Sequence, residues 1–120
     1  RVRTNNPLQA FVTLNDPVFV ECAQALARRI VKEGGSNPED RVRFALQLAL
    51  ARPPRDQQVG AVLALYRDAL ARYQADPKAA LTLATDPLGP LPAGLDPAEM
   101  AAWTTVANVL LNLDGVLTKG

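Results

Sequence analysis

Apolar residues recur at helical spacing along most of the chain, with polar residues at the positions between them. The clearest example follows Pro53-Pro54, where one face gathers Val59, Val62, Leu63, Tyr66, Leu70 and Tyr73. Arg67, Asp68 and Arg72 fall on the opposite side of the same segment. A repeat of three to four residues is typical of an amphipathic helix, so this segment is predicted to be one.

Two further amphipathic helices are predicted nearer the N-terminus. From Pro38 to about Ala51, one face gathers Val42, Ala45, Leu46, Ala49 and Leu50. From Pro17 to Gly34-Gly35, one face gathers Val18, Phe19, Cys22, Leu26 and Ile30, and the other holds Glu21, Gln24, Arg28, Arg29, Lys32 and Glu33. This pattern places Cys22 in the core as an inert small apolar side chain.

Several helix starts are marked by an acidic or amide residue followed by proline. The pairs are Asp16-Pro17, Asn37-Pro38, Asp76-Pro77 and Asp96-Pro97. A capping side chain and the fixed φ of proline both suit a first helical turn. The pairs predict a short helix over residues 76–84 and a last helix from Pro97 to about Asp114, ending at Gly115. Another short helix is predicted over residues 7–14.

Composition favours helix over strand throughout. Alanine and leucine supply 38 of the 120 residues, and isoleucine supplies one. This length is sufficient for one hydrophobic core but not for two domains. We therefore predict a single all-α domain over residues 1–120, a compact bundle of about five helices. Residues 86–97, with four prolines and two glycines, are predicted to form an extended connection before the last helix.

The predicted core of this bundle combines residues from four helices. It contains Leu26, Leu46, Val59, Leu63, Tyr66, Leu70, Trp103 and Leu110.

Charge and residue types exclude several functions. The net charge is +1, and the basic residues are interleaved with acidic ones, so no nucleic-acid partner is expected. The chain has no histidine, one serine and one cysteine, which excludes imidazole bases and covalent haem attachment. We expect no cofactor and no metal site in this chain. The nearly uncharged run 100–113 is shorter than the roughly 20 apolar residues of a membrane span.

Two groups of polar residues are candidate interaction sites. The first brackets the predicted helix 7–14 and consists of Arg3, Asn5, Asn6, Asn15 and Asp16. The second lies on the last helix and consists of Asn108, Asn112 and Asp114, with Thr104 one turn earlier. Helix capping and hydrogen bonds between domains explain the first group, and a hydrogen-bond network with the first group, or exposure on the outer face, explains the second. A ligand is the alternative for each group. We predict that the two groups meet, so that the ends of the chain lie side by side.

Three strings carry a resemblance to a known family. They are Arg3-Thr4-Asn5-Asn6-Pro7-Leu8-Gln9-Ala10, Arg52-Pro53-Pro54, and Trp103 followed by Val109-Leu110-Leu111-Asn112-Leu113-Asp114. Together they resemble the C-terminal half of the planctomycete domain of unknown function found in cytochrome-c-domain proteins, over essentially all 120 residues. The resembling family commonly has glycine where this chain has Ala51.

The resemblance implies a biological context. Proteins of that family look like large exported polypeptides, in which this domain lies near the C-terminus and haem c is held by an upstream domain. Upstream domains of the same chain would be the partners, and the location would be periplasmic or extracellular. The start at Arg1, without an initiator methionine, also indicates a piece of a longer polypeptide. The sequence does not indicate an oligomeric state.

These observations favour a non-catalytic scaffolding or interaction module. No catalytic residue is predicted, because helix caps and solvated faces explain the acidic residues. The alternative is an accessory part of an extracellular enzyme site, for example a polysaccharide-active one, completed by upstream domains. A docking surface for electron transfer is a third hypothesis. Enzymatic activity is not predicted for this chain alone.

Overall fold

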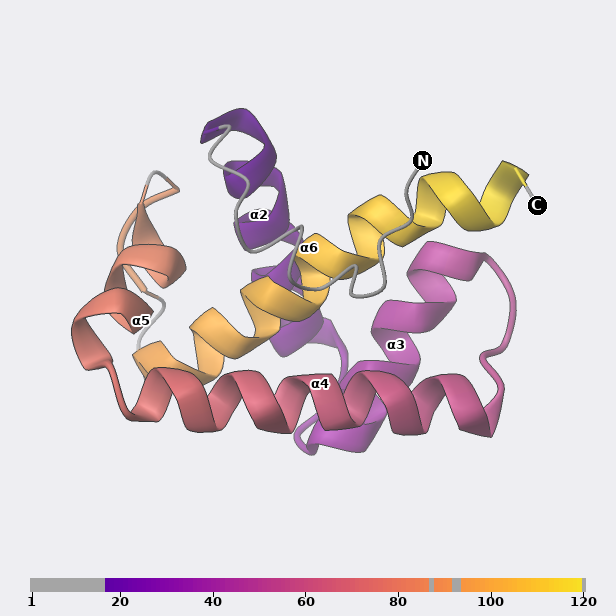
Figure 1. Cartoon of the computed structure of the whole chain (residues 1–120), viewed down its shortest axis with the longest axis horizontal. Helices are drawn as coiled ribbons and strands as arrows, with labels where there is room; N and C mark the ends of the chain where they lie inside the picture. Colours follow the sequence, from indigo (N-terminus) through magenta and orange to yellow (C-terminus); the bar gives the residue numbers. More distant parts are fainter. Residues whose placement is uncertain (1–16, 87, 92–93, 120) are drawn as a thin grey trace.

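The computed structural model describes residues 17–86, 88–91 and 94–119, and side chains between residues 20 and 112. Five helices follow one another: α2 (Pro17–Glu33), α3 (Pro38–Leu50), α4 (Asp56–Gln74), α5 (Pro77–Thr85) and α6 (Pro97–Lys119) (Figure 1). No strand occurs in these stretches. The predicted all-α bundle is thus confirmed. None of the described helices is long and apolar enough to cross a membrane.

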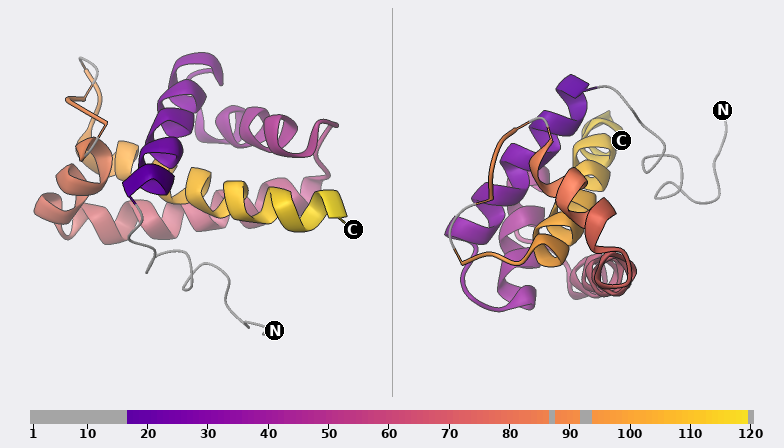
Figure 2. Two further views of the ribbon diagram at one scale, coloured as in Figure 1. Left: turned by 90° about the horizontal axis from the view of Figure 1, so that it is seen from above. Right: turned by 90° about the vertical axis from the view of Figure 1, so that its left-hand side faces the viewer.

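The last helix, α6, is the centre of the bundle. It contacts α2, α3, α4 and α5, and the two further views show these helices arranged around it (Figure 2). Every residue from Met100 to Ala107 is buried, including Thr104 and Thr105. A helix that is buried all round must be apolar or small on every side, which explains the run of alanines in α6.

An aromatic pair joins α4 to α6 inside this core. The rings of Tyr66 and Trp103 are stacked, with centroids 4.1 Å apart and planes 25° apart. Trp103 is fully buried and is the largest such side chain. Its indole Nε1 has no hydrogen-bond partner among the described residues, so it contributes by packing.

The predicted core is confirmed in its main members. Leu46, Val59, Tyr66, Trp103 and Leu110 are buried. The other three predicted core leucines are partly buried and pack against the same cluster: Leu26, Leu63 and Leu70.

The predicted capping residues hold the helix starts. Asn37 Oδ1 accepts the backbone N–H of Asp40 at 2.8 Å, and Asp76 Oδ1 accepts that of Ala79 at 3.2 Å. Asp96 Oδ2 accepts the backbone N–H of Glu99 at 3.1 Å. Each bond satisfies a donor that has no partner inside its own helix.

α3 ends on a strained residue. Ala51 adopts the left-handed conformation, with φ 57° and ψ 29°, and its N–H donates to Gln47 O at 2.8 Å. A side chain in this conformation costs roughly 1–2 kcal/mol, and glycine avoids the cost. A glycine at this position would fit the observed turn without strain.

Three predictions about the helices need correction or cannot be placed. α6 continues to Lys119, past the predicted end at Gly115, because a single glycine costs only about 1 kcal/mol and no proline follows. The predicted helix 7–14 lies outside the described residues. The described residues between Thr85 and Pro97 form turns and no regular element, as expected for this connection.

The orientation of α2 also differs from the prediction. Its buried face is centred on Ala23, Ala27 and Ile30, and the small side chains of the two alanines allow α6 to approach closely. At about 100° per residue, this face leaves Cys22 toward solvent, so the prediction of a buried cysteine is wrong. Gln24, assigned to the polar face, is fully buried because α5 covers that side of α2.

Candidate functional site

Most of the predicted interaction residues cannot be placed. Arg3, Asn5, Asn6, Asn15 and Asp16 lie outside the described residues, and so does the side chain of Asp114. The meeting of the two chain ends therefore stays a prediction.

The predicted polar stripe of α6 is largely bonded within its own helix. Asn112 Nδ2 donates to the backbone oxygen of Asn108 at 3.0 Å, and both residues are half-buried. Thr104 Oγ1 donates to Met100 O at 2.8 Å in the same way. Hydroxyl and amide groups bonded one turn back satisfy themselves without a ligand.

A buried polar contact between α2 and the end of α5 was not predicted. Gln24 Nε2 donates to Leu83 O at 2.5 Å and to Asp86 O at 2.9 Å. Gln24 Oε1 accepts the backbone N–H of Leu88 at 3.1 Å. The amide thus binds three backbone groups that lie about 60 residues away in the sequence. We call Gln24 and Arg28, together with the backbone they bind, the α2–α5 clamp.

Arg28 forms the second half of the clamp, one turn along α2. Its Nη2 donates to Ala84 O at 3.2 Å and to Gly89 O at 2.5 Å. The guanidinium therefore binds the last turn of α5, where unpaired carbonyl groups concentrate negative partial charge. The spacing of four residues between Gln24 and Arg28 signals a shared helix face. It does not signal which helix that face meets.

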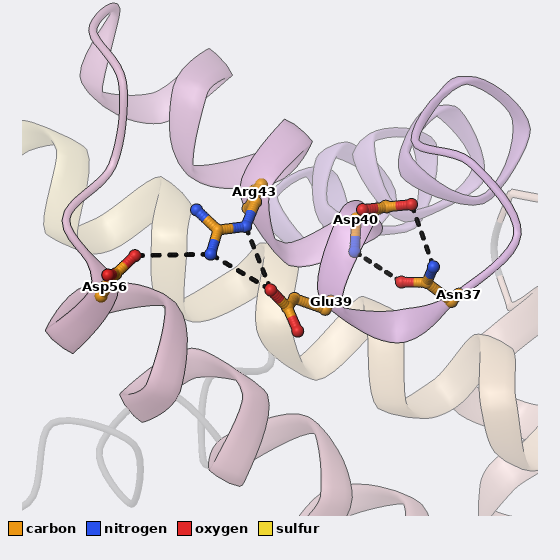
Figure 3. A network of polar contacts seen from close by, with 5 residues as sticks. All are labelled: Asn37, Glu39, Asp40, Arg43 and Asp56. Atoms are coloured by element: carbon orange, nitrogen blue, oxygen red, sulfur yellow. Dashed lines mark hydrogen bonds and ion pairs between the residues drawn. The ribbon is translucent and has the colours of Figure 1, made fainter.

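Two acidic residues, Glu39 and Asp56, pair with the same arginine, Arg43. Arg43 Nη2 lies 3.1 Å from Glu39 Oε2 and 3.4 Å from Asp56 Oδ1, joining α3 to the start of α4 (Figure 3). The hydrogen bond that Arg43 donates to Glu39 raises the pKa of Arg43, and Asp56 adds to this. The Asp56 side chain is 93% exposed, so water screens the network. Figure 3 also shows the hydrogen bond that Asn37 Nδ2 donates to Asp40 Oδ2, with 3.0 Å between the two atoms.

The buried ionisable group of the core is Tyr66. Burial raises the pKa of its hydroxyl, and the nearby carboxylate of Glu99 adds to the shift. A phenol that resists ionisation and stacks on Trp103 is a packing residue and not an acid or base near neutral pH.

An apolar groove opens where α2, α3 and α6 meet. It encloses about 210 Å³ and is lined by Leu26, Arg29, Ala45, Leu48, Ala49, Leu110 and Leu111. Leu48 is 38% exposed at this groove. Arg29 is paired with Glu33 at 3.4 Å, and its guanidinium lies 5.9 Å from the centre of the Phe44 ring. Within the described part of the chain, no three side chains of the metal-binding types come together.

Comparison with protein families gives one match. Residues 1–66 match the model of the PSD1 family, described as a protein of unknown function (DUF1553). The chain belongs to this family. The PSD1 match covers the first string, Arg3 to Ala10, and the Arg52-Pro53-Pro54 break. It lies in the N-terminal part of the chain and ends within α4, whereas the resemblance was expected over essentially all 120 residues.

The PSD1 match includes some of the structural features described above and leaves others outside it. It contains α2 and α3, and with them Gln24, Arg28 and two of the three groove walls. α5, α6 and the string from Val109 to Asp114 follow it. No curated protein and no solved structure matches the chain.

Proposed function

We propose that this chain is a non-catalytic helical module, which packs against other domains of a longer polypeptide and scaffolds them. By its resemblance, that polypeptide is exported, lies in the periplasm or outside the cell, and carries haem c in an upstream domain. The chain itself holds no cofactor in this proposal.

The proposal rests on the observation that polar side chains of the described residues bind other groups of the same fold. Gln24 and Arg28 bind backbone groups at the end of α5. The acidic residues with identified partners cap helices or bind an arginine or asparagine side chain, as Asp68 binds Arg72. Side chains that already bind the fold are poorly suited to catalysis, where a reacting group must reach the substrate.

Catalytic assays of the purified chain test the first half of the proposal. The chain is incubated with a panel of polysaccharides, and reducing ends are measured over time; the longer polypeptide is assayed in parallel. We expect no release by the chain alone. Turnover that scales with chain concentration and co-elutes with the folded monomer would contradict the proposal, because it would show that this chain holds a complete active site.

The second part of the proposal, scaffolding, requires that the chain bind another part of the same polypeptide. Pull-down of the upstream region by the immobilised chain provides the first test, with an urea-unfolded sample of the chain as control. Capture by the folded chain alone supports the proposal. Equal capture by both samples would mean that exposed apolar residues, and not the folded module, cause the binding.

A further inference from the structure

The groove between α2, α3 and α6 is an unfilled apolar surface in an otherwise well-covered bundle. Of the described large apolar side chains, two are exposed: Leu48 at the groove and Leu81 on α5, which does not line it. Apart from Arg29, every lining side chain is apolar. Exposed apolar surface of this kind gains free energy when another apolar group covers it.

We propose that the groove is the docking site of the chain's own N-terminal segment, residues 8–14. This segment lies outside the described residues, and its sequence Leu8-Gln9-Ala10-Phe11-Val12-Thr13-Leu14 supplies four large apolar side chains. Residues 4–15 contain no charged residue, so their burial requires no desolvation of an ion. The segment therefore has the chemistry that the groove would accept.

The segment can reach the groove. α2 begins at Pro17, and Leu26 lies nine residues further on, which is about 14 Å along the helix axis. Phe11 precedes Pro17 by six residues, a span of up to about 20 Å when extended. If residues 8–14 form the predicted helix, the two linking residues 15 and 16 and the helix from Phe11 to Leu14 together still allow about 15 Å.

The size of the groove favours a few side chains of the N-terminal segment as its occupant over a small molecule or a second copy of the chain. Its volume of about 210 Å³ is below the roughly 300–1,000 Å³ of small-molecule sites. Its one polar side chain, Arg29, is already paired with Glu33. A second copy of the chain would need to bury about 800 Å² per partner, which one exposed leucine and a small groove do not provide.

One continuous match to the PSD1 family covers residues 1–66, which include the segment and the α2 and α3 walls of the groove. The remaining wall, Leu110 and Leu111, immediately precedes Asn112. Docking of residues 8–14 would therefore bring Asn5 and Asn6 toward Asn112, as the predicted meeting of the chain ends requires.

Nuclear Overhauser effects in the unmodified, isotope-labelled chain of 120 residues test the docking directly. We expect contacts between the Phe11 ring or the Leu8 and Val12 methyl groups and the methyl groups of Leu48 or Leu110. They should persist unchanged on tenfold dilution. Absence of any contact from residues 8–14 to the groove would overturn the proposal. Contacts that disappear on dilution would also overturn it, since they would identify a second copy as the occupant.

Limited proteolysis provides a second measurement with a matched pair of variants. Leu48→Glu places a charge in the groove, and Leu81→Glu places one on an exposed leucine outside it. Cleavage by chymotrypsin after Phe11 should become at least tenfold faster in Leu48→Glu and change less than twofold in Leu81→Glu. Equal cleavage rates in the two variants, with helical circular dichroism retained, would overturn the proposal.

Discussion

Replacing Gln24 by leucine tests the α2–α5 clamp. Gln24 is fully buried, and its amide binds Leu83 O, Asp86 O and Leu88 N. Leucine has a similar size but no polar atom, so all three bonds are lost and three backbone groups lose their partner. At about 1 kcal/mol of net stabilisation per hydrogen bond, Gln24→Leu should lower the free energy of unfolding by about 3 kcal/mol. This is a large fraction of the roughly 5–15 kcal/mol of a typical domain.

Urea unfolding followed by circular dichroism measures this loss. With a slope of about 1.5 kcal/mol per molar urea, the midpoint should fall by about 2 M. Gln57→Leu is the matched control, because Gln57 is exposed on α4, and it should shift the free energy of unfolding by less than about 0.5 kcal/mol. A loss below about 1 kcal/mol in Gln24→Leu would refute the reasoning, since it would mean that water or other groups replace the three bonds at little cost.

Three further predictions concern the core and the backbone. Trp103→Ala should lower the free energy of unfolding by roughly 3–5 kcal/mol in urea titrations, because the indole is fully buried against Tyr66; a loss near zero would show that the indole is not part of the core. Ala51→Gly and Gly60→Ala should each raise the melting temperature, with gains of about 0.5–1 kcal/mol. The first relieves a positive φ, and the second adds a methyl group where no atom lies within 4 Å; a decrease in either would contradict the corresponding argument. Burial raises the pKa of Tyr66 above its ordinary value of about 10, so above that pH the tyrosine ionises readily only in the unfolded chain. The free energy of unfolding should therefore fall as pH rises past 10, and it should fall less steeply in Tyr66→Phe. Equal slopes of the free energy of unfolding against pH in the two proteins would exclude this cause.

Helix positions were predictable because local chemistry marks them. Proline preceded by aspartate or asparagine marks a helix start through its fixed φ and the capping side chain before it, and α3, α5 and α6 begin at the predicted proline. The end of α6 was not predictable in this way. One glycine only weakens a helix, and the neighbouring helices decide whether it continues.

The orientation of α2 shows what a single helix cannot reveal. Its apolar pattern placed Cys22 inside and Gln24 outside, and the structure places them the other way round. α2 has neighbours on more than one side, with α6 over the alanines and α5 over Gln24. The second contact joins residues about 60 positions apart, and periodicity within one helix carries no information about it.

The candidate sites were predictable to different degrees. Asn108 and Asn112 share a face of α6 as their spacing predicts, and one binds the backbone of the other. The groove was not predicted, because α6, which is distant in sequence from α2 and α3, forms one of its walls. Its residue Leu48 lies on α3, and only the packing of α6 shows that this leucine is left partly exposed.

Calorimetric titration of this chain with the upstream region of the same polypeptide tests the scaffolding proposal most directly. The account predicts saturable binding with one chain per upstream region and a negative heat-capacity change, because apolar surface is buried. The binding should be unaffected by Gln57→Leu, which changes an exposed residue. No binding by the folded chain at concentrations up to about 1 mM would contradict the account, since domains joined in one polypeptide meet at an effective concentration on the order of millimolar.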